Sequence, residues 1–158
     1  MTVCGIDPGI TGGITFIQNK NCVVAERIPI CSFKIGKKKK KFLALAKIIN
    51  RIDAYKPSRI FIEKQQAMPS QGVSSTFKTG FNYGLFIGIF ASQNYPYMEV
   101  SAHKWKSDLQ VSANKDEARQ RASELMPMAE EYWRLKCEDG VAESALIAYW
   151  GLHCGQEP

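Results

Sequence analysis

The stretch Thr2-Val-Cys-Gly-Ile-Asp7-Pro-Gly9 decides the predicted fold. Its nearly continuous apolar run indicates a strand that is covered on both faces, and Pro8-Gly9 ends that strand abruptly. Asp7 is left at the tip, where a carboxylate among buried residues needs a hydrogen-bond donor, a cation or a metal as a partner. A simple Asp-Pro-Gly turn would explain Asp7 equally well, so its interpretation depends on the other acids of the chain.

Length and composition predict one globular domain that spans residues 1–158, with 45% apolar and 23% charged residues. Lys and Arg outnumber Asp and Glu by 21 to 15, which gives a net charge of +6. This excess favours an anionic partner such as nucleic acid, although many basic proteins bind none.

The cysteines and the apolar runs indicate a cytoplasmic protein. The five cysteines form no CxxC or CxxH pair, so they suggest neither a zinc site nor a disulfide framework, and we expect reduced thiols. No apolar run approaches the roughly 20 residues that span a bilayer, so no membrane partner is expected. The N-terminus also lacks the features of a signal peptide.

Two further strands are predicted after the first turn, at residues 12–18 and 22–28. Short turns between them indicate an antiparallel meander. Glycines at positions 9, 12 and 13 permit a compact turn beside Asp7, where the phosphate of a ligand could approach the backbone closely.

A dense run of lysines occupies residues 34–41. The following helix carries an apolar face and ends at Pro57; that face comprises Phe42, Leu45, Ile49 and Ile52. Six lysines within eight residues repel one another, so the run is either a solvated loop or a contact for a DNA backbone. The candidate DNA contacts are Lys37, Lys38, Lys39, Lys40 and Lys41.

The stretch Arg59-Ile-Phe-Ile-Glu63 repeats the pattern of the first strand, because an apolar run again ends on an acid. We therefore expect Asp7 and Glu63 to face one cleft at the edge of the sheet. The polar loop at 64–72 carries Met68. This side chain either packs beneath its loop or inserts between DNA bases.

A helix is predicted from Val73 to Gln93, with Gly80, Gly84 and Gly88 on one face. Each interior glycine disfavours a helix by about 1 kcal/mol relative to alanine. Three in register imply a close neighbour, either the sheet beneath or a second subunit. Large apolar side chains lie beside this ridge: Phe77, Phe81, Leu85 and Ile89.

Basic side chains follow a predicted strand at 97–100, with Lys104 and Lys106 on either side of a tryptophan. Both are candidate DNA contacts. The sequence Asn114-Lys-Asp-Glu117 predicts a capping box at the start of the next helix. Lys115 takes the first helical position, where the dipole attracts anions, so it contacts a phosphate or is simply solvated.

The last predicted helix runs from near Asp139 to about His153 and is rich in alanine, which indicates burial. Asp139 and Glu143 lie four residues apart on one face, where like charges repel unless a cation lies between them. Gly140 permits a close approach in the first turn. We expect this acidic face to overlook a cleft.

Asp7, Glu63, Asp139 and Glu143 thus form a candidate site that contains oxygen ligands and neither histidine nor cysteine. Such a donor set suits Mg²⁺ or Mn²⁺. In a basic protein the obvious substrate is a phosphodiester, attacked by a metal-activated water while a second metal stabilises the leaving oxygen.

These motifs, in this order, resemble the RuvC-like Holliday junction resolvases of the RNase H-like superfamily. The matching stretches cover nearly the whole chain: Gly5–Gly9, Ile62-Glu63, Lys115 and Asp139–Ala148. The stretch Glu63–Gly72 is most similar to small resolvases encoded by bacteriophages. The resemblance implies a mixed five-stranded α/β sheet, with its first three strands antiparallel, flanked by helices.

The resemblance also implies how the protein acts. Two Mg²⁺ ions would be bound, with Asp7 bridging them, Glu63 and Asp139 each holding one and Glu143 completing the set. Lys115 would stabilise the pentacovalent phosphorus. A homodimer, with its interface near the glycine-bearing helix, would cut paired strands of a four-way junction and leave 5′ phosphates. One departure concerns Glu143, since bacterial members end with two aspartates three residues apart.

Three other functions fit part of the pattern. The stretch Gly5–Gly13 also resembles the first phosphate loop of actin-like ATPases, but 158 residues cannot supply the two lobes of that fold. An RNase H-like nuclease acting on RNA:DNA hybrids or other branched DNA would share the fold and the acids. A non-catalytic junction binder would not need all four acids.

Overall fold

A mixed sheet of five strands, in the order β3-β2-β1-β6-β7, forms the centre of the protein. The computed structural model describes residues 1–67 and 69–155. The strands are β1 (Thr2–Ile6), β2 (Gly13–Gln18), β3 (Asn21–Arg27), β6 (Arg59–Lys64) and β7 (Tyr97–Ser101). β1 to β3 are antiparallel, whereas β6 and β7 are parallel to β1. The predicted meander and the predicted mixed sheet are confirmed.

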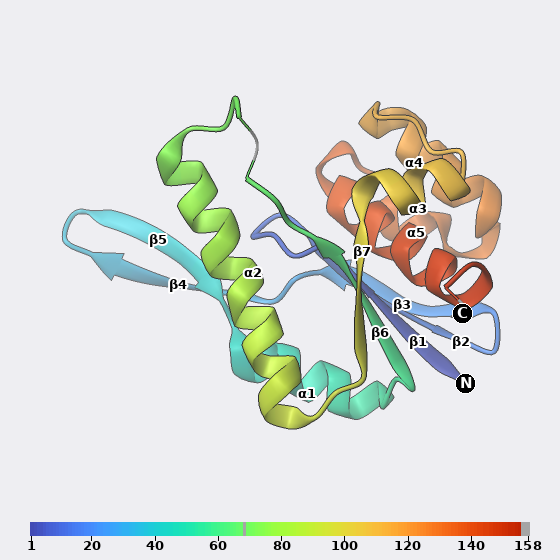
Figure 1. Cartoon of the computed structure of the whole chain (residues 1–158), viewed down its shortest axis with the longest axis horizontal. Helices are drawn as coiled ribbons and strands as arrows, with labels where there is room; N and C mark the ends of the chain where they lie inside the picture. Colours follow the sequence, from blue (N-terminus) through green and yellow to red (C-terminus); the bar gives the residue numbers. More distant parts are fainter. Residues whose placement is uncertain (68, 156–158) are drawn as a thin grey trace.

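Helices cover both faces of this sheet (Figure 1). Alternate residues of each strand point to opposite faces. Cys4 and Ile62 pack in a core with α1 (Leu45–Tyr55) and α2 (Val73–Gln93). Val3 and Phe61 pack on the other side with α3 (Ala102–Asp108), α4 (Lys115–Leu125) and α5 (Asp139–His153). Two 3-10 segments join α4 to α5, η1 (Pro127–Trp133) and η2 (Lys136–Glu138).

Helix α5 lies directly against β1 and β2, and glycines make this contact possible. A Cβ atom at Gly5 would overlap the backbone of α5 at Ser144 and Ala148. Gly12 and Gly140 form an isolated parallel bridge, so the turn after β1 touches the first turn of α5. The bounds and the burial predicted for this helix are confirmed.

The lysine run forms a β-hairpin, so the alternative that it is a solvated loop is wrong, whereas the DNA contact stays a prediction. β4 (Ile30–Ile35) pairs with β5 (Lys38–Leu43) in a separate two-stranded sheet. Gly36 adopts φ +61° in the two-residue turn, a conformation that favours glycine. The strand spreads the lysines over two faces, which reduces the repulsion that a compact loop would impose. Phe42 therefore belongs to β5, and α1 begins only at Leu45.

The glycine ridge of α2 faces open space. A Cβ atom at Gly80, Gly84 or Gly88 would meet no atom within 4 Å, so the sheet is not the close neighbour. On the same helix, Phe77 is 72% exposed and Phe81 is 51% exposed. The alternative that the ridge packs on the sheet is wrong, and a second subunit stays a prediction. In the described part of the chain, no helix combines the length and the apolarity needed to cross a membrane.

Candidate active site

The strand register brings Asp7 and Glu63 to the same edge of the sheet. Ile6 at the end of β1 pairs with Ile62 of β6 in parallel, and each acid is the next residue along its chain. Parallel neighbours end side by side, as the sequence pattern predicts.

A tight turn holds the backbone of Asp7. Asp7 N donates a hydrogen bond to Gly13 O (3.1 Å), and Gly9 N donates one to Asp7 O (3.0 Å). A Cβ atom at Gly12 would overlap the Asp7 carbonyl, so this position requires glycine. A Cβ atom at Gly140 would lie 3.0 Å from Asp7 Oδ2, which places the carboxylate at the start of α5.

The Asp7 carboxylate is poorly solvated and lies near other negative charges. Burial, followed by the charges of Glu143 and Glu63, raises the pKa of Asp7 from 3.8 to about 8. Lys115 and Lys106 lower this pKa but do not compensate fully. Such a perturbed carboxyl group in a cluster of charges is typical of functional sites.

Glu63 is held in place by two side-chain donors. Trp105 Nε1 donates to Glu63 Oε2 (2.9 Å), and Gln65 Nε2 donates to Glu63 Oε1 (3.1 Å). Burial raises the pKa of Glu63, whereas the bond from Trp105 lowers it, and the nearby Glu143 charge raises it. Trp105 is fully buried in α3, so it fixes the orientation of this carboxylate.

Glu143 of α5 pairs with Lys106 of α3. Lys106 Nζ lies 2.9 Å from Glu143 Oε1, and the two side chains are 26% and 18% exposed. Ser101 is the N-cap of α3, and its Oγ accepts a hydrogen bond from Lys104 N (3.2 Å). This cap sets the helix so that Trp105 and Lys106 both reach the acids.

Asp139 lies beside two cations of α4. Lys115 Nζ is 3.8 Å from Asp139 Oδ2, and Arg119 Nε is 3.1 Å from Asp139 Oδ1. The second contact lacks hydrogen-bond geometry, and among the described residues neither buried atom has another hydrogen-bond partner. Asp139 Oδ1 is therefore a buried acceptor with unused capacity.

The cap of α4 departs in part from the prediction. Asn114 Oδ1 accepts a hydrogen bond from Asp116 N, as an N-cap residue should. The return bond of a capping box is not made, because Asn114 N donates to Ser112 Oγ instead. Lys115 still occupies the first helical position, with its side chain 69% exposed.

The four acids fit a hard divalent cation by their chemistry. Asp7 has a raised pKa, Asp139 Oδ1 lacks a hydrogen bond, and all the candidate ligands are oxygens. Within the described ranges, however, no three acidic, histidine or cysteine side chains are gathered closely enough to hold a metal ion. The contacts explain this, because Glu63, Asp139 and Glu143 are each engaged by donors or cations of the protein.

Sequence reasoning missed Arg119, Trp105 and Gln65 as members of the site. Arg119 lies four residues after Lys115, and that helical spacing was a usable signal. Lys106 was expected to contact DNA, and its position beside Glu143 adds a role inside the site. Lys104 instead pairs with Asp108 at 2.7 Å, outside the acidic cluster.

The other predicted DNA contacts lie away from the acids or outside the described residues. Lys38 to Lys41 lie on β5, and Lys37 lies in the turn between β4 and β5. Met68 lies outside the described residues. The DNA contacts of all these side chains stay predictions.

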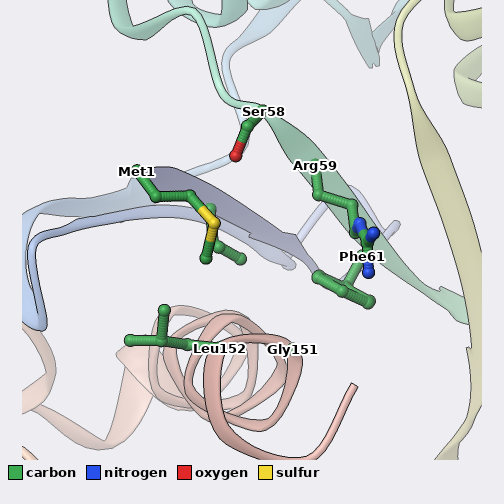
Figure 2. Close-up of a pocket in the computed structure, with 7 residues that line it drawn as sticks. Met1, Ser58, Arg59, Phe61, Gly151 and Leu152 are labelled. Carbon is green, nitrogen blue, oxygen red and sulfur yellow. The ribbon is translucent and has the colours of Figure 1, made fainter. Parts of the chain in front are cut away.

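A pocket of about 410 Å³ at the opposite end of β1 and β6 contains none of the four acids (Figure 2). Its lining comprises Met1, Val3, Ser58, Arg59, Phe61, Gly151 and Leu152. Arg59 donates to the Gly155 carbonyl at 3.3 Å, so its charge is partly used within the chain. The candidate site is therefore the acidic edge of the sheet and not this pocket.

Comparison with known proteins identifies the fold. No family model matches the sequence, and no curated protein matches it. The structure of Thermus thermophilus RuvC in complex with a Holliday junction substrate matches 100% of this chain and 99% of its own chain, with a TM-score of 0.64 and 16% identity. The chain has the RuvC fold.

Two further solved structures with the RuvC fold agree. Another structure of Thermus thermophilus RuvC covers 96% of both chains, with a TM-score of 0.60 and 17% identity. The yeast mitochondrial Holliday junction resolvase covers 92% of this chain and 76% of its own, with a TM-score of 0.51 and 16% identity. The fold implied by the sequence resemblance is thus confirmed.

Proposed function

We propose that the chain is a structure-selective endonuclease that resolves four-way DNA junctions by paired phosphodiester hydrolysis, leaving 5′-phosphate ends. The observation that carries the proposal is the position of Asp7, Glu63 and Glu143 within electrostatic reach of one another at one edge of a RuvC fold. The solved structure with the highest TM-score cited above is that of a RuvC bound to a Holliday junction.

Asp7, Glu63, Asp139 and Glu143 are the residues that would hold two Mg²⁺ ions, for which Mn²⁺ would substitute. When bound, the metals supply a nucleophilic water and charge stabilisation at the leaving oxygen. Asp139 Oδ1 lacks a hydrogen bond and Asp7 has a raised pKa, so these two acids are the primary ligands in this proposal. Glu143 would have to leave Lys106 to take part.

The cations around the acids have separate roles in this proposal. Lys106 and Arg119 hold Glu143 and Asp139 in position and limit the repulsion among the carboxylates. Lys115 is the most exposed of the three, so it is the one that can contact the scissile phosphate. A lysine suits this role because it is a mobile point charge.

A homodimer would place two such sites on one junction. The open ridge at Gly80, Gly84 and Gly88, together with exposed Phe77 and Phe81, supports α2 as its interface. Small residues permit close helix approach, and large exposed apolar side chains mark an interaction surface.

The test is cleavage of a panel of end-labelled substrates by the purified protein in Mg²⁺ and in EDTA. The panel contains a four-way junction, a three-way junction, a linear duplex and an RNA:DNA hybrid. We expect Mg²⁺-dependent nicks at symmetric positions of the four-way junction, and Asp7→Asn should abolish them while binding persists. Equal cutting of junction and duplex would contradict the proposal, and preferred cutting of the hybrid would favour the RNase H-like alternative.

A further inference from the structure

The β4–β5 hairpin extends away from the five-stranded sheet (Figure 1). Residues 32–41 are all exposed, so the body of the protein does not cover the outer part of the hairpin on either face. The outer part of the hairpin therefore does not contribute to the hydrophobic core.

The two faces of the hairpin differ in chemistry. Directly opposed residues of an antiparallel pair share a face. One face carries the pairs Cys31↔Phe42, Phe33↔Lys40 and Ile35↔Lys38, and the other carries Ser32↔Lys41 and Lys34↔Lys39. The first face is aromatic and basic, whereas the second is polar and basic.

The aromatic face leaves large apolar side chains in water. Phe33 is 57% exposed and Ile35 is 49% exposed. The rings of Phe33 and Phe42 lie 5.9 Å apart at an angle of 56°, so Phe42 supports Phe33 from one side and leaves the rest of its ring open. An exposed apolar patch of this kind marks a binding surface.

Charge restricts what this surface can bind. No acidic residue occurs between Arg27 and Asp53. In the part of the chain that the structure describes, none of Lys34 and Lys37–Lys41 takes part in an ion pair. A second hairpin of the same chain would be repelled by these six charges. The complementary partner is a polyanion that also offers apolar flat surfaces, which is a nucleic acid.

Exposed phenylalanine distinguishes unpaired from paired nucleotides. In a duplex the base faces are stacked on one another, so a duplex would satisfy the lysines and leave Phe33 in water. An unpaired base presents a free face on which an aromatic ring stacks, while lysines neutralise the flanking phosphates.

We infer that the Phe33 face of the β4–β5 hairpin binds unpaired nucleotides. Phe33 stacks on a base, and Lys38 and Lys40 contact the phosphates on either side. The opposite face, with Lys34, Lys39 and Lys41, contacts the backbone of a paired arm. This inference rests on the proposed function, for which it names a preference for junctions whose centre is opened.

The test measures binding by the full chain in the Asp7→Asn background, in EDTA, by fluorescence anisotropy. The probes are a single-stranded oligonucleotide, a linear duplex, a fully paired four-way junction and a junction with unpaired bases at its centre. Each is titrated at several salt concentrations, so that the slope of affinity against salt reports the phosphate contacts.

Phe33→Ala should weaken binding of the single strand and the opened junction by between about 5-fold and 100-fold. It should leave duplex affinity and the salt slope unchanged. Phe33→Trp should retain or increase the affinity for the single strand, and Phe33→Leu should behave like alanine, because leucine is apolar but lacks a flat aromatic face. Phe33 is exposed, so the variants should fold, and circular dichroism checks this.

Two controls separate the faces. Leu135→Ala removes a large apolar side chain that is 54% exposed outside the hairpin and should not change single-strand affinity. Lys39→Ser, on the other face, should weaken binding of the duplex and of both junctions, reduce their salt slope by about 0.9, and leave single-strand affinity unchanged.

Equal losses of duplex and single-strand binding in Phe33→Ala would overturn the inference. A shift of Phe33→Ala towards monomer in light scattering, with unchanged DNA affinity, would assign this face to a protein interface instead. Cleavage of the substrate panel by the wild-type protein is measured in a separate experiment. A chain that binds unpaired DNA through Phe33 but cuts no junction would refute the proposed function and leave this inference standing.

Discussion

Lys106 Nζ lies 2.9 Å from Glu143 Oε1, and this ion pair joins α3 to α5 across the acidic edge of the sheet. Two residues earlier on the same helix, Lys104 pairs with Asp108 instead. One short helix thus directs one lysine into the candidate site and another away from it.

Replacing Lys106 by glutamine should lower junction cleavage at pH 7 by about 10- to 100-fold, the usual effect of losing a partner that positions a metal ligand. The Lys106 charge lowers the pKa of Asp7, so its loss should also move the pH profile of cleavage to higher pH. Lys104→Gln is the matched control and should retain the wild-type profile. Equal losses in both variants would mean that Lys106 acts only by contacting DNA.

Asp7→Asn should stabilise the metal-free protein at neutral and alkaline pH. The pKa of Asp7 is raised from 3.8 to about 8, so the stability that protonated Asp7 contributes is complete below pH 3.8 and is lost as the pH rises to about 8. Asparagine stays neutral throughout. The difference in unfolding free energy between the variant and the wild type should therefore grow over this pH range, by at most about 1.4 kcal/mol per pH unit.

Urea unfolding in EDTA at pH 5, 7 and 9 measures this advantage. Saturating Mg²⁺ should stabilise the wild type at pH 8 and should have little effect on the Asp7→Asn variant. A stability difference that does not vary with pH would show that Asp7 ionises normally in the folded protein.

Trp105→Phe should move the acidic limb of the cleavage profile to higher pH, because the hydrogen bond from Trp105 lowers the pKa of Glu63. The smaller ring also leaves a cavity, so we expect a loss of unfolding free energy of about 1–3 kcal/mol. Trp133→Phe provides the control. Trp133 is also buried, but its Nε1 donates a hydrogen bond to Ser123 and not to one of the four acids. It should lose similar stability without any change in the pH profile.

Gly84→Ala tests the glycine ridge of α2. Alanine favours the helix by about 1 kcal/mol, and its Cβ meets nothing within 4 Å in the chain. The variant should therefore be more stable as a monomer. A dimer that packs on this ridge should become weaker and dissociate at a higher protein concentration than the wild type. Sedimentation equilibrium combined with urea unfolding measures both effects. An increase in stability with unchanged self-association would remove α2 from the interface.

Gly140→Ala should have the opposite effect on stability. Its Cβ would lie 2.7 Å from Gly12 Cα and 3.0 Å from Asp7 Oδ2, so the turn after β1 would have to move. We expect a loss of unfolding free energy of about 2 kcal/mol or more, as overpacking produces. A variant with wild-type stability would show that the Gly12–Gly140 contact is loose.

Much of the sheet and the acidic edge can be predicted from sequence, because they follow from local patterns. Apolar runs that end at Asp7 and Glu63 locate β1 and β6, and the alanine-rich stretch from Asp139 locates α5. The register that pairs Ile6 with Ile62 is an observation of the structure, and it sets the two acids side by side.

The remaining features depend on contacts that the chain order does not encode. Lys106 and Glu143 are 37 residues apart, and no pattern in either segment specifies the partner. The β4–β5 hairpin was missed because lysine disfavours strands. The alternation of Cys31, Phe33 and Ile35 before Gly36 was nevertheless a signal for a hairpin.

The position of α5 has a consequence for biosynthesis. β1 and β6 leave the ribosome long before α5, yet Asp139, Glu143 and the bridge at Gly140 all belong to that later segment. Until α5 has been made, a nascent chain exposes the face of β1 and β2 that this helix covers, and it lacks half of the acids. Premature termination before residue 139 would release a chain that lacks Asp139, Glu143 and a large part of one core.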